Sequence, residues 1–506
     1  MHPAPGTHRF PRRFAAVVVG AVLALVAPAI AAPRATNADP QAAATTYTNP
    51  IKSQNGADPW LVHQDGDYYL ISTTFTNTLV TRRSPTLAGL ATAPGIQVWQ
   101  DTTASRGTNI WAPELHRFNG RWYLYYSAGA VGAACCDTQR THVLESAGTD
   151  PLGPFTYKGM LTGSNLNPGG WLIDASVLSL NGSLYLLGSG SINGGKQSLV
   201  IAPMSNPYTL SSSTFSVISS PTLSWETSGA AVNEGPVALQ RGGKTFIVYS
   251  ASYCDTADYK LGQLTYTSGS PLSASSWSKK STPIFQRNDS AGVYGPGHNG
   301  FFTSPDGTES WIVYHANSSA SGGCGNGRTT RAQKFTWNSD GTPNLGTPQA
   351  TGTALTAPSG ETAATPAAYK LVNRNSGKCL DLDGGSTSDG ANVRQWTCNG
   401  GNNQRWRLED QADDTSRLVN VASGKVLDVA DCSTADGADL RQWNWLNNTC
   451  QRFRMVYTAT GGWVRLVNQA TGKVADVADC GTADGADVRQ WTWLGNTCQQ
   501  WSIQPA

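Results

Sequence analysis

Three acidic residues stand at matching positions in five similar sequence segments. The segments read DPWLVHQDGDYYLIS from Asp58, APELHRFNGRWYLYYS from Ala112, DASVLSLNGSLYLLGS from Asp174, EGPVALQRGGKTFIVYS from Glu234 and NGFFTSPDGTESWIVYH from Asn299. Each first residue lies eight positions before the first glycine of a turn. Carboxyl groups brought together in this way suit glycosidic-bond hydrolysis, in which one protonates the leaving oxygen and another activates water on the opposite face. The alternative is that each carboxylate caps a hairpin or binds a structural ion.

The segments predict the strands that must position these carboxylates. Each has an alternating apolar stretch, a glycine turn and an aromatic-rich stretch, which is typical of two strands in a hairpin. Spacings of 54 to 65 residues leave room for two outer strands in each unit. Five four-stranded units arranged radially would form a five-bladed β-propeller, with the first residue of each inner strand beside the central channel.

Further residues are candidates for the same site. Trp111, in NIWAPELH, either stacks on a sugar ring or seals a blade interface. Glu114 lies two residues further along and is expected to be a structural hydrogen-bonding residue. His298, in YGPGHNG, either holds an ion or water in the channel or is a core histidine. The candidate substrate contacts are Phe75, Trp111, Asn299 and Arg328.

A second repeat system begins near Tyr369. It reads GKCLDLDGGSTSDGANVRQW, GKVLDVADCSTADGADLRQW and GKVADVADCGTADGADVRQW. Three units of about 47 residues, each too small to bury its own core, predict a β-trefoil. Each unit offers an Asp beside a Trp as a candidate sugar pocket, namely Asp381 with Trp396, Asp428 with Trp443 and Asp476 with Trp491. Regular spacing of 19, 18 and 18 positions predicts the disulfides Cys379–Cys398, Cys432–Cys450 and Cys480–Cys498.

The chain therefore divides into a leader and two all-β domains. Basic residues followed by an apolar run and Ala29-Ile30-Ala31 predict a signal peptide and short leader over 1–38. The propeller is expected over 39–351, a Thr/Ala/Pro/Gly linker over 352–367 and the trefoil over 368–506. Export fits disulfide formation, although the pairing of Cys135, Cys136, Cys254 and Cys324 stays open. A net charge of +2 gives no reason to expect a nucleic acid or a membrane as a partner.

The first repeat region resembles glycoside hydrolase family 43. The motifs that carry this resemblance are ADPWLV, WAPELHRFNGRWYLYYS, IDASVL and NEGPVAL, in that order. Family members invert anomeric configuration and act on arabinans, arabinoxylans or xylo-oligosaccharides. The resemblance implies Asp58 as general base, Glu234 as general acid, and Asp174 as the residue that raises the pKa of the acid and orients it. It also implies that His298 lies in the channel near a possible structural ion, with no cofactor required.

The second repeat region is similar to the ricin B-type carbohydrate-binding module, family 13. The sugar site of that family uses an Asp, an aromatic residue and a following Asn, which match Asp381, Trp396 and Asn403. In the other two repeats Cys450 and Cys498 stand where that Asn is expected. The disulfide of each of these repeats therefore differs in position from the one usual for the family. Which residue would take the place of the Asn in those two pockets is left open.

These features predict a secreted, monomeric exo-α-1,5-L-arabinofuranosidase that binds arabinan and plant cell-wall polysaccharide. Alternatives within the enzyme class are an endo-arabinanase, a β-xylosidase and an arabinoxylan arabinofuranohydrolase. The alternative from another class is a lectin that binds sugar without cleaving it. The segments VGAACCDTQRTH and NSSASGGCGNGR are candidates for loops that block one end of the cleft and thereby decide between exo and endo action.

Overall fold

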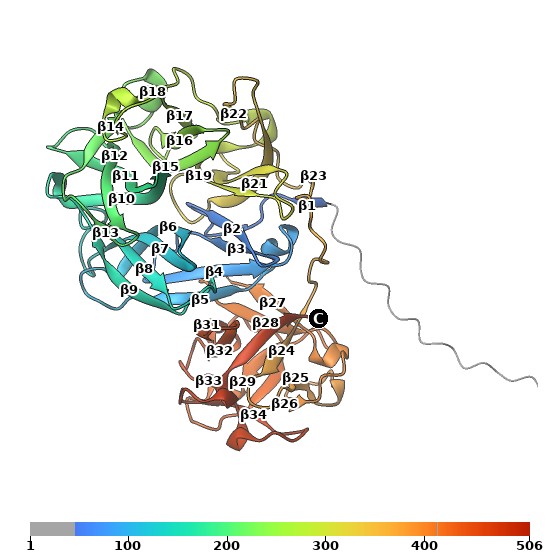
Figure 1. The fold of residues 1–506 in the computed structure, drawn as a ribbon. Helices are drawn as coiled ribbons and strands as arrows, with labels where there is room; N and C mark the ends of the chain where they lie inside the picture. Colours follow the sequence, from blue (N-terminus) through green and yellow to red (C-terminus); the bar gives the residue numbers. More distant parts are fainter. Residues whose placement is uncertain (1–45, 412) are drawn as a thin grey trace, which may run out of the picture. The chain divides into compact units, whose positions relative to one another are not determined.

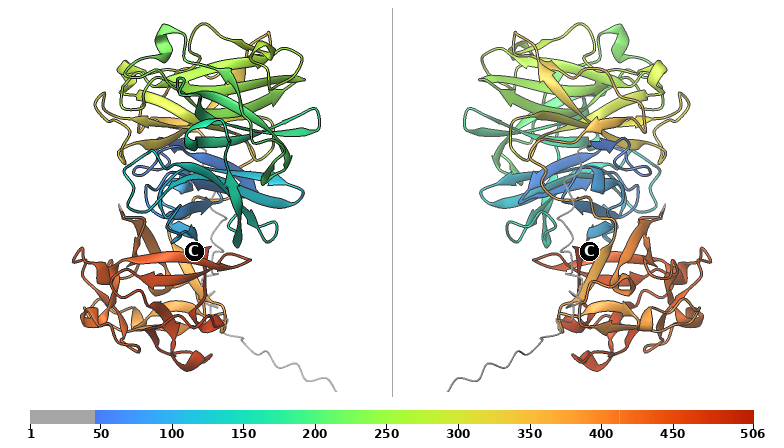
Figure 2. Two further views of the ribbon diagram at one scale, coloured as in Figure 1. Left: turned by 90° about the vertical axis from the view of Figure 1, so that its left-hand side faces the viewer. Right: turned by 90° about the vertical axis from the view of Figure 1, so that its right-hand side faces the viewer.

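A computed structural model describes residues 46–411 and 413–506 of the chain (Figure 1). These residues form strands joined by turns and short 3-10 helices, as two further views also show (Figure 2). No helix within the described ranges has the length and apolarity needed to cross a bilayer. The predicted signal peptide and leader, 1–38, lie outside the described residues. The 3-10 helices are η1 (Ala88–Ala91), η2 (Ser224–Glu226), η3 (Ala274–Ser276), η4 (Asp289–Ala291), η5 (Asp383–Gly385), η6 (Asn402–Gln404), η7 (Ala430–Cys432), η8 (Thr449–Gln451), η9 (Ala478–Cys480) and η10 (Thr497–Gln499).

Residues 60–344 form a propeller-like series of antiparallel sheets, in which each strand of a sheet pairs with the next along the chain, except that β14 pairs with β12. One separate sheet contains β6 (Thr108–Phe118), β7 (Arg121–Gly129), β8 (Arg140–Ser146) and β9 (Phe155–Leu161). The next contains β10 (Leu166–Leu180), β11 (Ser183–Ile192), β12 (Ser198–Asn206), β13 (Thr209–Leu210) and β14 (Ser216–Ser219). Two more contain β15 (Asn233–Arg241), β16 (Lys244–Ala251), β17 (Lys260–Tyr266) and β18 (Trp277–Lys279), and then β19 (Tyr294–Thr303), β20 (Ser310–Asn317), β21 (Thr329–Trp337) and β22 (Pro343–Asn344).

A fifth group of strands has the same order but is not a separate sheet. It contains β2 (Trp60–Gln64), β3 (Asp67–Ile71), β4 (Thr78–Ser84) and β5 (Gly95–Gln100). Its last strand, β5, pairs in parallel with β31 (Phe453–Ala459) of the C-terminal region, so the sheet continues into that region. Four blades are thus separate sheets within the described residues, against the five predicted.

Alternation of side chains along each strand supplies both faces of a sheet with apolar residues. Leu186 and Leu187, adjacent in β11, illustrate this. Leu186 belongs to the same buried cluster as Tyr125 of β7, whereas Leu187 shares a cluster with Ile247 of β16. Successive residues of a strand point to opposite faces, so one strand packs against both neighbouring sheets. Each fully buried side chain of this kind contributes roughly 1.5–3 kcal/mol.

The two ends of the propeller region meet. The strands β1 (Thr46–Thr48) and β23 (Ala354–Thr356) pair in antiparallel fashion. The hydroxyl of Tyr47 and the side-chain amide of Asn49 each donate to the carbonyl of Ala332 in β21, over 2.8 Å. The predicted linker, 352–367, is therefore not free of regular structure, because its alternating Thr-Ala-Leu-Thr run forms β23 and pairs with β1.

The C-terminal region contains three repeats of four strands. The first repeat has β24 (Tyr369–Asn373), β25 (Cys379–Leu382), β26 (Val393–Trp396) and β27 (Trp406–Asp410). The second has β28 (Ser416–Asn420), β29 (Val426–Val429), β30 (Leu440–Trp443) and β31. The third has β32 (Trp463–Asn468), β33 (Val474–Val477), β34 (Val488–Trp491) and β35 (Trp501–Pro505).

The aromatic residue near the end of each repeat lies in the core of this region. Trp406, Phe453 and Trp501 are at most 1% exposed and belong to one apolar cluster. The three predicted disulfides, Cys379–Cys398, Cys432–Cys450 and Cys480–Cys498, are all present. Because each cross-link lies within one repeat, it fixes a unit that would bury too little apolar surface alone.

Candidate active site

β-Bulges place side chains at the pocket end of the inner strands. The pairing of β6 with β7, β10 with β11, β15 with β16 and β19 with β20 shifts register near the start of the inner strand. In each pair, the register shift nearer the hairpin turn contains one residue with a left-handed backbone, which re-aims the chain as bulges do. Asp58, two residues before β2, has the same conformation. The positive φ angles are 50° at Asp58, 44° at Ala112, 56° at Asp174, 54° at Gly235 and 44° at His298.

The predicted equivalence of the first residues of the five segments therefore holds for Asp58, Ala112 and Asp174. It is wrong by one residue for Glu234 and Asn299. Glu234 precedes the left-handed position, and Asn299 follows it. In the fourth hairpin both turn residues are glycines, Gly242 and Gly243, since Arg241 pairs with Lys244. The equivalent turn glycine is thus the second one, and counting back from it gives Gly235. The fifth hairpin has a longer turn, because Thr303 pairs with Ser310.

Asp58, Asp174 and Glu234 nevertheless line a single pocket of about 430 Å³. Of the other predicted residues, Phe75, Trp111, His298 and Arg328 also line it. The volume is in the range of small-molecule binding pockets. Lining residues that the sequence did not predict as site residues are Asn109, Trp171, Ile173, Gln197, Tyr253 and four cysteines, Cys135, Cys136, Cys254 and Cys324.

Asp58 is held in its ionised form. Its Oδ1 atom lies 3.0 Å from a guanidinium nitrogen of Arg328, and its Oδ2 atom accepts a hydrogen bond of 2.6 Å from the hydroxyl of Thr73. Burial opposes ionisation, but the positive charge of Arg328 holds the pKa of Asp58 well below its ordinary value. An ionised carboxylate can accept a proton from water, which is what a general base requires.

Thr73 orients this carboxylate through a short relay. The backbone N–H of Ala112 donates to the Thr73 hydroxyl over 2.8 Å, so the hydroxyl proton is directed to Asp58. His315 acts from the other side, since its Nδ1 atom accepts the backbone N–H of Asp58 over 3.1 Å. Burial lowers the pKa of His315 to about 4, which leaves the ring neutral and this nitrogen free to accept. Neither residue carries a sequence signal that would have marked it.

Glu234 has the opposite electrostatic environment. Its two oxygens accept hydrogen bonds of 2.8 Å, one from the hydroxyl of Tyr259 and one from the side-chain amide of Gln197. Burial raises the pKa of Glu234 to about 7, and the negative charge of Asp58 adds to the rise. A carboxylic acid that keeps its proton near neutral pH can serve as a general acid.

Asp174 is linked to Glu234 through the backbone. Its Oδ2 atom accepts the N–H of Gly235 over 3.1 Å, which fixes the peptide next to the acid. Burial, followed by the charges of Glu234 and Asp58, raises the pKa of Asp174 well above its ordinary value. Two buried carboxyl groups that repel each other retain a proton between them, so the pair favours a protonated acid.

Two aromatic residues form one wall of the pocket. The rings of Phe75 and Trp111 meet edge to face with centroids 6.5 Å apart, and the Arg328 guanidinium lies 5.8 Å from the centre of the Phe75 ring. The predicted substrate contact Asn299, by contrast, is 1% exposed and does not line this pocket. Asn299 lies within the bulge, one residue after the left-handed His298, and its side chain is buried. Glu114, expected to be a structural hydrogen-bonding residue, is buried and contacts Nε2 of His116 over 2.7 Å.

The predicted ion near His298 has limited support from the donors present. Nδ1 of His298 lies 3.4 Å from Asp58, and burial lowers the pKa of the His298 ring. Within residues 46–411 and 413–506 no group of three or more His, Cys, Asp or Glu side chains is arranged to hold a metal ion. These side chains do not by themselves fit a metal site. The structural ion therefore stays a prediction.

The sequence of the propeller-like region matches a known enzyme family. Residues 47–343 match the family described as Glycosyl hydrolases family 43. The chain belongs to this family. Its propeller-like region is therefore the catalytic domain of a glycoside hydrolase, and the two electrostatically distinct carboxyl groups lie in that domain.

Named relatives add to this family assignment. An "Extracellular exo-alpha-(1->5)-L-arabinofuranosidase" of Streptomyces avermitilis is 41% identical over 352 residues, which cover 67% of this chain and 72% of that protein. A protein of the same name from Streptomyces chartreusis is 37% identical, covering 60% of this chain and 89% of its own. A crystal structure of an alpha-L-arabinofuranosidase from Lactobacillus brevis superposes with a TM-score of 0.56 and 34% identity, covering 61% of this chain and 98% of that one.

This family 43 chain also contains a lectin-like domain. Residues 360–443 and 449–506 match the Ricin-type beta-trefoil lectin domain-like family. In its first repeat, Oδ2 of Asp381 accepts hydrogen bonds of 2.8 Å from Asn403 and 2.9 Å from Gln404. The predicted Asp and Asn therefore do meet, although Asp381 is only 1% exposed.

The other two repeats of the lectin-like domain differ at this point. The disulfides Cys432–Cys450 and Cys480–Cys498 occupy the positions that Gly385 and Asn403 have in the first repeat. Asp428 and Asp476 are buried, at 4% and 5% exposure, and have no equivalent of the Asn403 amide.

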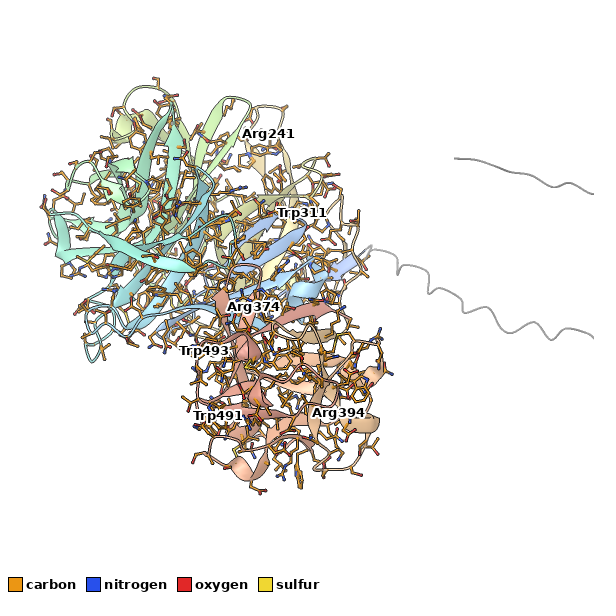
Figure 3. All side chains as sticks on the ribbon, turned by 60° about the horizontal axis from the view of Figure 1, so that its bottom comes forward. Arg241, Trp311, Arg374, Arg394, Trp491 and Trp493 are labelled. Atoms are coloured by element: carbon orange, nitrogen blue, oxygen red, sulfur yellow. A yellow bond between two sulfur atoms is a disulfide. The ribbon has the colours of Figure 1, made fainter. Side chains whose placement is uncertain are left out.

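An arginine that the sequence interpretation missed joins each predicted Asp to its Trp. Arg394, labelled in Figure 3, lies 3.4 Å from Asp381 and stacks 4.4 Å from the centre of the Trp396 ring. Arg441 bridges Asp428 and Trp443, and Arg489 bridges Asp476 and Trp491, in the same way. Each arginine precedes its Trp by two residues, which puts both on one face of the strand. One face of each Trp is thus covered by a guanidinium.

Proposed function

We propose that the protein is a secreted, inverting exo-α-1,5-L-arabinofuranosidase that releases arabinose from arabinan and arabino-oligosaccharides. The observation that carries the proposal is the opposite ionisation of two carboxyl groups in one pocket, Asp58 being held as carboxylate and Glu234 as acid. The names of the two Streptomyces relatives support the sugar and the bond. Their being named extracellular supports secretion.

The proposed reaction is a single displacement. Asp58 takes a proton from a water molecule, and the oxygen of that water attacks the anomeric carbon of the terminal arabinofuranosyl unit. Glu234 gives its proton to the oxygen of the departing sugar, so that the bond between that oxygen and the anomeric carbon breaks. Asp58 ends protonated and Glu234 ionised, and exchange with solvent restores both. The reaction needs no cofactor because the two carboxyl groups supply both proton transfers.

Asp174 is proposed to support the acid. Its hydrogen bond from Gly235 holds the peptide next to Glu234 in place, and the two carboxyl groups repel each other when both are ionised. Tyr259 and Gln197 fix the two oxygens of Glu234, so the proton-bearing group cannot rotate freely.

The exo assignment is supported by the loops at the pocket. The two segments expected to block one end of a cleft contribute Cys135, Cys136 and Cys324 to the pocket lining. Cys324 is bonded to Cys254, which ties the loop after β20 to the loop after β16. Such a cross-link over 70 positions stiffens both loops. A small pocket with stiff walls suits a chain end better than the middle of a polymer.

The products formed first from linear 1,5-arabinan test this proposal. We expect arabinose as the sole product from the earliest times, measured by chromatography of the reaction mixture with the full-length protein. Early appearance of a ladder of oligosaccharides would instead identify an endo-arabinanase. If arabinan and arabino-oligosaccharides give no product while xylo-oligosaccharides do, the arabinose assignment is wrong.

Arg328 should set the pH range of the reaction. Its positive charge lowers the pKa of Asp58 and also that of Glu234. In Arg328→Met both pKa values rise, so Asp58 becomes protonated at higher pH and Glu234 keeps its proton to higher pH. We therefore expect both limbs of the kcat/KM profile against pH to move upward, with the larger loss of activity on the acid side.

The control for this experiment is Arg287→Met, which removes an arginine that pairs with Asp289 outside the pocket. Its pH profile should overlay that of the unmodified protein. A profile of Arg328→Met that falls in height without moving along the pH axis would show that Arg328 does not tune these carboxyl groups.

We further propose how the domains work together. The β2-β3-β4-β5 group has the strand order of the other blades and directly follows Asp58, so we take it as the first of five blades. The catalytic domain then spans 39–351, the connecting segment 352–367 and the lectin-like domain 368–506. The lectin-like domain keeps the enzyme near plant cell-wall polysaccharide by raising its effective concentration there, with the first repeat as the main sugar site. Because one chain supplies the whole pocket, the monomer is sufficient for activity.

A further inference from the structure

The disulfide between Cys135 and Cys136 needs an explanation other than stabilisation of the fold. The two cysteines are adjacent in the chain and bonded to each other. A cross-link between neighbours closes a minimal loop, and the stabilisation that a disulfide provides grows with the length of the loop it closes. Both side chains are exposed, so the pair does not belong to an apolar core. Both line the pocket that contains Asp174 and Glu234.

Two hydrogen bonds hold the segment that carries this disulfide at the pocket. Nε1 of Trp171 in β10 donates to the carbonyl of Cys136 over 2.8 Å. The side-chain amide of Gln139 donates to the carbonyl of Asn109 in β6 over 2.9 Å. Trp171 and Asn109 themselves line the pocket. The disulfide is therefore held at a defined position by two elements of the catalytic site.

The chemistry of the pair suits contact with a sugar ring. A disulfide between adjacent residues is a compact ring with little rotational freedom, and its sulfur atoms are apolar and polarisable. A furanose presents C–H groups as well as hydroxyl groups. Packing a preorganised apolar surface against those C–H groups costs little conformational entropy, whereas two free cysteine side chains would have to be ordered on binding.

We propose that the Cys135–Cys136 disulfide is a substrate-contacting wall of the pocket, which packs against the C–H groups of the terminal arabinofuranosyl unit and positions it for Glu234. The proposal rests on the arabinofuranosidase function proposed above and adds a specificity-determining element to it. It also makes sugar binding depend on the oxidation of this pair, which a chain exported to an oxidising environment maintains.

The test is the full-length Cys135→Ser/Cys136→Ser variant with arabinotriose as substrate. Loss of one apolar wall should raise KM roughly tenfold and weaken inhibition by arabinose by a similar factor, with a smaller change in kcat. The midpoint of thermal unfolding should stay close to that of the unmodified protein, because so short a cross-link stabilises the fold little. The matched control is Cys379→Ser/Cys398→Ser, which breaks a disulfide in the lectin-like domain and should leave KM for arabinotriose unchanged.

A second variant keeps the proposal testable if the double variant is not secreted. Trp171→Phe removes the donor to the Cys136 carbonyl but retains an aromatic ring, and KM should rise several-fold as the disulfide becomes less fixed. The proposal is overturned if KM and arabinose inhibition are unchanged in the double variant, or in Trp171→Phe where the double variant does not fold. If the unmodified protein cleaves no arabino-oligosaccharide, the failure lies instead in the proposed function.

Discussion

Glu234→Gln should lower kcat for arabino-oligosaccharides by roughly 10²- to 10⁴-fold, the usual contribution of a positioned general acid. The amide keeps the size of the side chain but cannot give a proton to the departing sugar oxygen. The unmodified enzyme should lose activity as pH rises through about 7, because Glu234 then loses its proton. That alkaline limb should be absent from the profile of the variant, measured as kcat/KM against pH.

A change of leaving group distinguishes loss of the general acid from a general loss of structure. An aryl α-L-arabinofuranoside with an acidic phenol as leaving group needs little protonation, so Glu234→Gln should retain much more of its activity on that substrate. Binding to insoluble arabinan through the lectin-like domain should be unaffected. Glu145→Gln, at a carboxylate that pairs with Lys158 outside the pocket, is the matched control and should behave as the unmodified enzyme. Equal losses on both substrates would assign the acid to another residue.

The convergence of Asp58, Asp174 and Glu234 can be predicted because it follows from the spacing of these residues along the chain. A strand has a side-chain period of two and a hairpin has a turn of defined length, so a residue counted back from the turn falls near a known place. Two things displace the count by one residue at Glu234 and Asn299. One is a turn with two glycines and the other is a longer turn. Because of this displacement, the side chain of Asn299 lies in the interior and does not line the pocket.

The residues that tune the carboxyl groups are not predictable in the same way. Thr73, Gln197, Tyr259 and His315 each come from a different strand or loop, and each contacts a carboxylate or its backbone across 15 to 257 positions of the chain. Their side chains are common ones in strands, so nothing in their local sequence distinguishes them. A hydrogen bond between residues 257 positions apart follows from closure of the ring of sheets, as with Asp58 and His315.

Cysteine pairing shows the same contrast between local and distant information. The three disulfides of the lectin-like domain follow from repeat spacing, and that prediction is confirmed. Cys254 and Cys324 belong to loops of different blades, so their partnership depends on how blades pack and cannot be obtained from spacing. Adjacent Cys135 and Cys136 offer no spacing to interpret, and their bond to each other becomes evident only with the pocket in view.

Asp58→Asn should be at least as damaging as Glu234→Gln, and its signature should differ. The carboxylate of Asp58 is kept ionised by Arg328, and Asn in its place cannot take a proton from water. We expect kcat to fall by roughly 10²- to 10⁴-fold on arabino-oligosaccharides and on aryl arabinofuranosides alike, since both require attack by water. Asp67→Asn, at a surface ion pair with Arg83, is the matched control.

Azide tests whether the missing function is that of a base. This anion attacks carbon without having to lose a proton, so it should restore part of the turnover of an aryl arabinofuranoside by Asp58→Asn and yield a glycosyl azide of inverted configuration. It should do nothing comparable for oligosaccharide cleavage by Glu234→Gln, where the missing proton belongs to the leaving group. If azide rescues Glu234→Gln and not Asp58→Asn, the two roles are reversed. Burial acts on both carboxyl groups, but the ion pair with Arg328 lowers the pKa of Asp58 whereas the pKa of Glu234 is raised to about 7, which argues for Asp58 as the base and Glu234 as the acid.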